Sequence, residues 1–145
     1  ENNWEKLKMN ESVEYKPVLS GVPKSLPALV KANRVQEKVR GVGFDWDDRT
    51  QVWDKVEEEL KELKEEIRKG DEKSIETEFG DVFFSLINAA RLYGIDPESA
   101  LERTNKKFIR RFNYLEGKTI QEGKSLHDMS LEEMDRIWDE AKNLE

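Results

Sequence analysis

The sequence predicts an all-α protein, a helical bundle of about five helices. Three observations support this fold class. Several segments carry apolar residues at the i, i+3, i+4 spacing of an amphipathic helix, and short glycine-containing connections separate these segments. No window alternates polar and apolar residues with the period of two that marks a strand. Amphipathic helices joined by short connections bury their apolar faces against one another in a bundle.

The N-terminal part of the chain differs in composition from the rest. Pro17, Pro23 and Pro27 fall within eleven residues, and serine and glycine lie between them. Proline and glycine at this density interrupt helices and strands. We therefore expect a linker or N-terminal arm over residues 1–25 and a folded domain over residues 26–145.

The first two helices have recognisable ends. Pro27 suits the first position of a helix that Gly41 ends, and a second helix is predicted from about Thr50 to Lys69, where Gly70 closes it. The apolar residues of this second helix follow the helical period and predict a narrow core stripe: Val56, Leu60, Leu63 and Ile67.

Three further helices complete the bundle. The segment from about Ser74 to Tyr93 is apolar over a wide arc, and Gly94 ends it. Asp96 and Pro97 are typical of the cap and first turn of a fourth helix, which continues to about Leu115. The segment Ser130–Glu133 has the pattern of a capping box and opens a short last helix.

The composition excludes several functions. The chain has no cysteine and a single histidine, which argues against a disulfide framework, thiolate catalysis and a histidine-rich zinc site. With 32 acidic and 25 basic residues the net charge is −7, which argues against a nucleic-acid partner. The longest apolar stretch, residues 82–90, is about half a membrane span. We expect a cytoplasmic protein with neither nucleic-acid nor membrane partners.

Two pairs of carboxylates carry the metal hypothesis. Glu59 and Glu62 are spaced i, i+3 on one face of the second helix, and Glu78 and Asp81 repeat this spacing on the third. Carboxylates beside a core are costly unless they are paired or bind a metal. An all-oxygen quartet suits Mg²⁺. The open alternatives are a solvated acidic flank and salt bridges to a neighbouring helix.

The fourth helix is rich in cations, which a phosphate substrate would need beside the metal. Asn105 lies among its basic residues, and Lys107 and Arg111 share one helix face at i, i+4. The alternative interpretation is an ordinary basic surface that balances the acidic helices.

Taken together, these motifs resemble a known family. Glu58, Glu59 and Glu62, followed by Glu78 and Asp81, are similar to the EExxE…ExxD signature of the MazG-type nucleoside triphosphate pyrophosphohydrolases. The similarity includes the segments Gly43–Trp46 and Lys107–Phe112 and covers most of residues 26–145 in order. The chain resembles the C-terminal MazG domain of proteins that carry two such domains.

The resemblance implies Mg²⁺-dependent hydrolysis of nucleoside triphosphates to a monophosphate and pyrophosphate, with Mn²⁺ as a second possible ion, broad base acceptance and a role in nucleotide-pool housekeeping. It also implies a four-helix active-site core completed in a homodimer or higher homo-oligomer. The implied metal ligands are Glu59, Glu62, Glu78 and Asp81. The implied substrate-binding residues are Lys55, Asn105, Lys107 and Arg111 for the triphosphate and Trp138 for the nucleoside. The candidates for the group that accepts a proton from water are Glu58 and Glu62.

Two alternatives stay open at this point. One is an enzyme of the same superfamily restricted to a single deoxynucleotide such as dUTP or dCTP. The other is a non-catalytic helical module whose acidic helices bind a basic partner.

Overall fold

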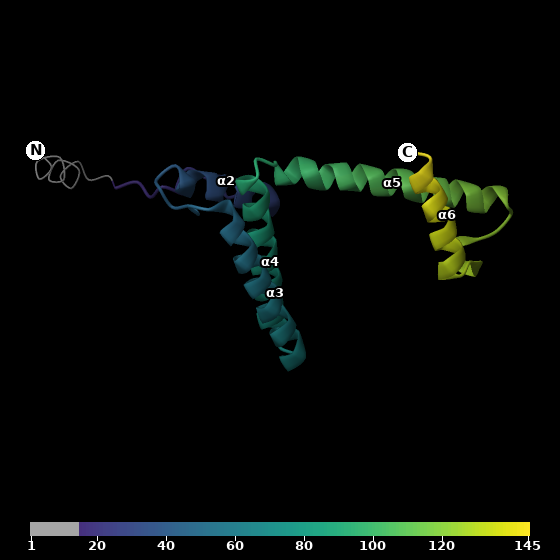
Figure 1. Cartoon of the computed structure of the whole chain (residues 1–145), viewed down its shortest axis with the longest axis horizontal. Coiled ribbons are helices and arrows are strands. Elements are labelled where there is room, and N and C mark those ends of the chain that lie inside the picture. Colours follow the sequence, from purple (N-terminus) through teal and green to yellow (C-terminus); the bar gives the residue numbers. More distant parts are fainter. Residues whose placement is uncertain (1–14) are drawn as a thin grey trace, which may run out of the picture. The chain divides into compact units, whose positions relative to one another are not determined.

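The computed structural model describes residues 15–145, and every regular element in this part of the chain is a helix (Figure 1). The α-helices are α2 (Ala28–Arg40), α3 (Val52–Lys69), α4 (Glu72–Leu92), α5 (Pro97–Gln121) and α6 (Leu131–Asn143), and the 3₁₀ helices are η1 (Arg49–Gln51) and η2 (Leu126–Asp128). The all-α prediction of about five helices is confirmed. Within residues 15–145, none of these helices combines the length and apolar character needed to cross a bilayer.

The described part of the chain divides into two compact units, a first unit that ends at Pro97 and a second unit of residues 98–145. Of the predicted linker, residues 1–14 lie outside the described residues, and residues 15–25 contain turns and no helix. The single domain over residues 26–145 and the four-helix core completed by a second copy stay predictions.

In the first unit, α3 and α4 form a hairpin of adjacent helices, and α2 packs against α4 (Figure 1). The hairpin turns within two residues because Gly70 ends α3 in the left-handed conformation, at φ +82°. Glycine adopts this conformation without the steric penalty of a Cβ atom. The backbone N–H of Gly70 donates to the carbonyl of Glu66, which satisfies one of the last carbonyls of the helix.

The buried face of α3 differs from the predicted stripe. Val56 and Leu63 are buried as expected, but Leu60 is 38% and Ile67 is 50% exposed. Besides Val56 and Leu63, the buried positions on α3 are Val52 and Glu59. The face that packs on α4 is therefore rotated away from Leu60 and Ile67, and it includes a carboxylate.

In the second unit, α5 and α6 pack around Leu115, Met129 and Ile137. Helix α5 continues six residues beyond the predicted end at Leu115, because the helix accommodates Gly117. Thr119 is buried in this extension, and its hydroxyl donates to the carbonyl of Leu115 at 2.7 Å. The predicted capping box at the start of α6 is confirmed: the Ser130 side chain accepts a hydrogen bond from the backbone N–H of Glu133.

A charged network fastens the loop between α2 and η1 to helix α4. The guanidinium of Arg91, whose side chain is 6% exposed, donates to both carboxylate oxygens of Asp45, at 2.7 and 3.3 Å. The same group donates to Asn88 Oδ1 at 2.6 and 3.2 Å. The Arg91 hydrogen bond is the main reason why the pKa of Asp45 lies below its usual value. The loop is therefore held by the ionised form of Asp45.

We expect Asp45→Ala to lower the free energy of unfolding at pH 7 by about 1.5–3 kcal/mol, because charge-assisted hydrogen bonds to a buried guanidinium are lost. A carboxylate with a lowered pKa contributes stability above its unfolded pKa and loses it as the pH falls through the folded value. The difference between wild type and variant should therefore shrink below about pH 4. Urea unfolding at several pH values measures both effects.

Asp47→Ala is the matched control, because this exposed aspartate lies two residues away in the same loop. It should stay within about 0.5 kcal/mol of wild type at every pH. Equal losses in the two variants would contradict the role given to Asp45.

Candidate functional site

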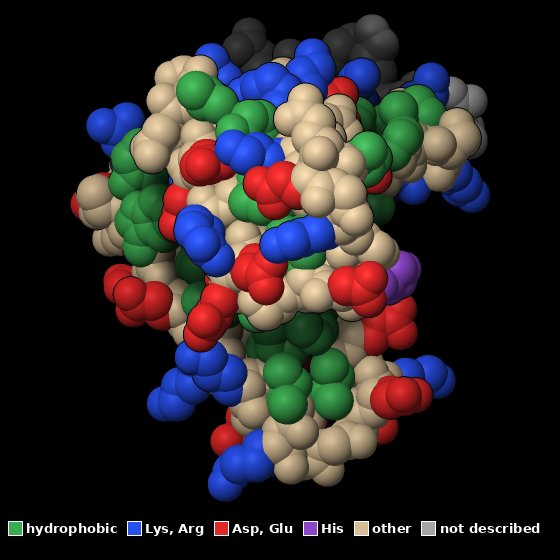
Figure 2. Space-filling model, turned by 90° about the vertical axis from the view of Figure 1, so that its right-hand side faces the viewer, with side chains coloured by type: hydrophobic (Ala, Val, Ile, Leu, Met, Phe, Trp, Pro, Cys, Tyr) green, Lys and Arg blue, Asp and Glu red, His purple; other side chains and the backbone are tan. Residues whose placement is uncertain are grey.

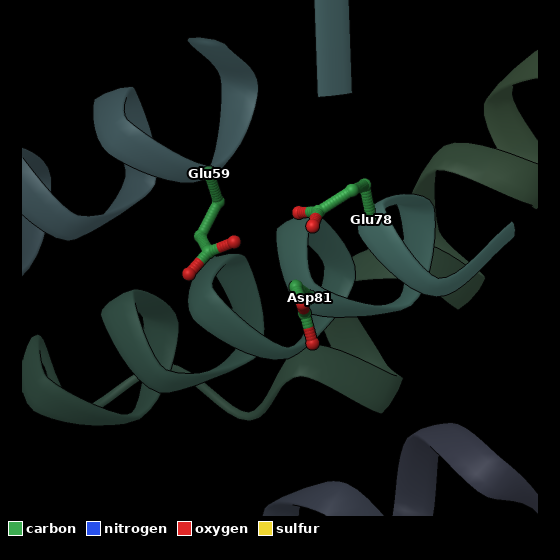
Figure 3. Close-up of side chains that lie close together, drawn as sticks. All are labelled: Glu59, Glu78 and Asp81. Atoms are coloured by element: carbon green, nitrogen blue, oxygen red, sulfur yellow. The ribbon is translucent and has the colours of Figure 1, made fainter. Parts of the chain in front are cut away.

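Three carboxylates meet between α3 and α4. Glu59 extends from α3 toward Glu78 and Asp81 of α4 (Figure 3). One ligand atom from each lies within 4.8 Å of the others. Glu59 reaches this position because it shares the packed face of α3 with Val56 and Leu63, and it is only 6% exposed.

The cluster concentrates negative charge beside the cation Lys55. Lys55 Nζ lies 2.9 Å from Glu59 and 3.5 Å from Glu58, and the bond to Glu59 is the main cause of the raised pKa of Lys55. Burial is the main cause of the raised pKa of Glu78, and the charges of Glu62, Asp81 and Glu59 add to it. Glu78 therefore ionises less readily than a solvated glutamate.

Two oxygens of the cluster lack the partners that buried acceptors usually have. The Oε2 atoms of Glu59 and Glu78 are buried and make no hydrogen bond within residues 15–145. A buried carboxylate oxygen without a donor is costly, and a hard divalent cation would satisfy it. The residues present therefore fit an oxygen-binding ion such as Mg²⁺.

The other two predicted carboxylates lie at the edge of the cluster. Glu62 is exposed and is not a member of the three-carboxylate group. The charge of Glu59 is nevertheless the main cause of the raised pKa of Glu62, so the two groups are electrostatically coupled. Glu58 is also exposed and shares Lys55 with Glu59. Their predicted roles as metal ligand and proton acceptors stay predictions.

A cavity of about 740 Å³ adjoins the cluster in the first unit. Lys55, Glu59 and Asp81 form one part of its wall. The remaining wall consists mostly of apolar side chains together with two carboxamides and the Asp45–Arg91 pair: Val35, Gln36, Val39, Phe44, Asp45, Trp46, Val52, Phe84, Asn88 and Arg91 among them. A cavity of this size and polarity is typical of sites for small organic molecules.

Sequence reasoning did not identify the two carboxamides of this wall, Gln36 and Asn88. Gln36 lies on the apolar face of α2, beside Val35 and Val39, and is 3% exposed. A polar residue inside an amphipathic stripe was the available signal, but a single glutamine there does not indicate what it faces.

The remaining predicted site residues lie in the second unit. Two guanidinium nitrogens of Arg111, Nε and Nη2, donate to the carboxylate of Glu145 at 3.0 and 2.9 Å. Trp138 packs on Phe108, with ring centroids 5.0 Å apart. Asn105 is exposed and Lys107 is half-buried. That these four residues act with the carboxylates of the first unit stays a prediction.

Comparison with known proteins finds similarity to nucleoside triphosphate pyrophosphohydrolases. The model of the MazG nucleotide pyrophosphohydrolase domain matches residues 49–115. A nucleoside triphosphate pyrophosphohydrolase/pyrophosphatase MazG from Thermotoga maritima is 41% identical over 140 residues, which are 96% of this chain and 54% of that protein. A nucleoside triphosphate pyrophosphohydrolase of Escherichia coli K12 is 37% identical over 146 residues, 98% of this chain and 56% of that protein.

Uncharacterized protein YabN of Bacillus subtilis is 49% identical over 145 residues, which are 99% of this chain and 30% of that protein. The chain thus spans about half the length of the two pyrophosphohydrolases that it matches, and less than a third of the third relative.

We expect Mg²⁺ to raise the melting temperature of the protein by about 5–11 °C at a concentration 100-fold above its Kd, because an ion bound only by the folded state stabilises that state. Glu78→Gln should lose most of this rise. Its melting temperature without metal should equal or exceed that of wild type, because one of three mutually repelling carboxylates is gone. Thermal unfolding across a Mg²⁺ titration checks both expectations.

Glu76→Gln provides the matched control, since Glu76 is exposed on the same helix and outside the cluster. It should keep the wild-type response to Mg²⁺. An undiminished Mg²⁺ response in Glu78→Gln would remove Glu78 from the metal site.

Proposed function

We propose that the chain hydrolyses nucleoside triphosphates to a nucleoside monophosphate and pyrophosphate in the presence of Mg²⁺, and the match of residues 49–115 to the MazG nucleotide pyrophosphohydrolase domain supports this proposal. The observation that carries the proposal is the three-carboxylate cluster with its two unpartnered buried oxygens, which lies inside the matched segment. The printed names of the two pyrophosphohydrolase relatives support the same activity.

In this proposal the carboxylates of the first unit hold the cation. Glu59, Glu78 and Asp81 contribute the oxygens, and Glu62 adds negative charge at the edge. When bound, Mg²⁺ supplies positive charge against the triphosphate and lowers the pKa of water. Mn²⁺ prefers the same oxygen ligands and is expected to substitute.

The chain's own cations neutralise the remaining negative charge of the substrate. Lys55 already lies at the rim of the cluster, and its raised pKa keeps it protonated at neutral pH. Asn105, Lys107 and Arg111 of α5 are proposed to hold the triphosphate, and Trp138 of α6 to lie against the nucleoside. Glu58 or Glu62 would accept the proton of the attacking water, since both carboxylates are exposed and near Lys55 or Glu59.

We propose that two copies of the chain associate through the outer face of the α3–α4 hairpin, which would complete a four-helix core. Large apolar side chains on these two helices are between 38% and 59% exposed: Leu60, Ile67, Phe79, Phe83 and Leu86. Figure 2 shows several groups of exposed hydrophobic side chains among acidic and basic ones. Exposed apolar patches of this kind mark association surfaces.

We propose broad acceptance of bases, in a cytoplasmic housekeeping role. The alternatives are restriction to dUTP or dCTP and a helical module without catalysis. A panel of canonical and damaged triphosphates, incubated with the protein and Mg²⁺, separates the three. Broad acceptance predicts monophosphate and pyrophosphate from most of the panel, restriction predicts turnover of one deoxynucleotide, and a module predicts turnover of none.

Glu59→Gln and Asp81→Asn should lower kcat/KM for ATP at least about 100-fold, because changing a residue that merely orients a metal ligand already costs 10- to 100-fold. Both variants keep the size of the side chain, so circular dichroism should report an unchanged helical content. Pyrophosphate release measures the activity. Rates near those of wild type in either folded variant would contradict the metal site.

The ion pair between Arg111 and Glu145 gives a test of the phosphate-binding role. If Arg111 binds the triphosphate, Glu145→Gln should lower KM about two- to fivefold, because the guanidinium no longer has to leave an ionised partner. Glu140→Gln is the matched control, since it breaks the pair with Lys118, which is not a proposed substrate ligand. An unchanged KM in Glu145→Gln and in Arg111→Ala would remove Arg111 from the site.

A further inference from the structure

One face of helix α4 forms a wall of the cavity along about three turns of the helix. The residues that line this wall recur every three to four positions, as one helix face requires: Asp81, Phe84, Ser85, Asn88 and Arg91. Asp81, at one end of the wall, belongs to the carboxylate cluster. Arg91, at the other end, lies ten residues further on, which is about 15 Å along the helix axis. Arg91 therefore belongs to the end of the cavity that lies away from the cluster.

The side chain of Arg91 is a buried cation that binds two other residues of the cavity wall. It is only 6% exposed, and it donates to both carboxylate oxygens of Asp45 and twice to Asn88 Oδ1. A second cation, Arg40, lies 3.4 Å from Asp45 but is largely exposed, and exposed pairs contribute little. A planar guanidinium with fixed donors holds its partners in one geometry. Arg91 therefore fixes the arrangement of this end of the cavity.

Asp45 extends this arrangement into the loop between α2 and η1. The loop begins with a turn in which the backbone N–H of Phe44 donates to the carbonyl of Val39 at 2.9 Å. Phe44 and Trp46, on either side of Asp45, line the cavity, and both side chains are exposed. Because neither of them is buried, the loop depends on the bonds between Asp45 and Arg91 for its position against α4.

On the basis of the proposed function, we infer that Arg91 is a positioning residue for substrate binding: it holds the loop between α2 and η1 in the position that the nucleoside triphosphate requires, and it does not touch the reacting atoms. Without the guanidinium, the loop occupies this position for only part of the time, and the apparent affinity falls by that fraction. The carboxylate cluster keeps its own contacts on α3 and α4, so the chemical step is preserved. The expected signature is a raised KM at an unchanged kcat.

The first variant is Arg91→Gln, which removes the guanidinium and keeps a polar side chain. The KM for ATP should rise about tenfold, which corresponds to a loop that is in place about one-tenth of the time. The kcat should stay within about twofold of wild type, and the rise of the melting temperature with Mg²⁺ should be retained. Far-UV circular dichroism and thermal unfolding define a temperature at which the variant is folded. A fall in kcat as large as the rise in KM, or loss of the Mg²⁺ response, would overturn the inference, because Arg91 would then act on the carboxylate cluster.

Asp45→Asn tests the same bonds from their other side, and it takes the place of Arg91→Gln if that variant does not fold. The KM of Asp45→Asn should also rise at an unchanged kcat, because the substitution keeps the size of the side chain and removes the charge that strengthens the bonds. In the double variant, KM should rise no further than in the more affected single variant, since the two substitutions remove one interaction. Effects that multiply in the double variant contradict a role of Arg91 through Asp45.

Tyr93→Phe is the matched control. The hydroxyl of Tyr93 accepts a hydrogen bond from Trp53 Nε1 at 3.0 Å, which also joins the C-terminal end of α4 to another part of the first unit, the start of α3. Within residues 15–145, neither of these two residues is part of the cavity wall. The variant keeps both aromatic rings and should keep the wild-type KM. A rise in KM as large as that of Arg91→Gln would indicate a general loosening of this end of α4 and overturn the inference.

The inference and the proposed function fail in different ways. If wild type hydrolyses ATP and folded Arg91→Gln has an unchanged KM, the pyrophosphohydrolase stands and the role of Arg91 is wrong. If wild type hydrolyses no triphosphate, the proposed function fails. Calorimetry with Mg²⁺ and α,β-methylene-ATP, which cannot be cleaved between its α- and β-phosphates, then replaces the kinetic assay. An affinity about tenfold weaker in Arg91→Gln supports the inference, whereas equal affinities, or no binding by wild type, overturn it.

Discussion

The packing of α3 against α4 holds three carboxylates close together against their mutual electrostatic repulsion. Glu59, Glu78 and Asp81 lie within 4.8 Å of one another, and Lys55 is the nearby cation. Carboxylates held this closely repel each other when ionised, and the charges of the neighbouring carboxylates add to the rise that burial causes in the pKa of Glu78. The apolar contacts of the α3–α4 hairpin offset this repulsion and hold the oxygens in place before any ion arrives. An oxygen-binding cation would convert the same arrangement from destabilising to stabilising.

The polar bonds that fasten the first unit together also arrange the cavity. The bond from Gln36 to the Phe84 carbonyl joins α2 to α4, and it leaves the glutamine oxygen as an oriented acceptor. The bonds from Arg91 to Asp45 and Asn88 fasten the preceding loop and fix the position of the Asn88 carboxamide oxygen. Because hydrogen bonds within the protein hold both carboxamides, their orientation does not depend on a ligand. Preorganised groups of this kind lose little entropy on binding.

Local signals in the sequence were sufficient for most of the fold. Gly70 ends α3 as predicted, and Ser130 caps α6 as predicted, because both effects depend on residues within one helical turn. The predicted end of α5, at about Leu115, was wrong. The helix continues to Gln121 because its neighbouring residues and the burial of Thr119 outweigh the low helix propensity of Gly117. The exposure of Leu60 was also not predicted: the helical period gives an apolar stripe but does not say which edge of it faces a neighbour.

The sequence by itself determined the helices and the spacing that puts carboxylates on one face of each of two helices, since an α-helix repeats every 3.6 residues regardless of its surroundings. Only the tertiary structure decided which carboxylates meet. The rotation of α3 against α4 buries Glu59 with Val56 and leaves Glu62 exposed. It also decided that Gln36 lines the cavity with an unpartnered oxygen. These facts depend on contacts between helices far apart in the chain, which no local pattern encodes.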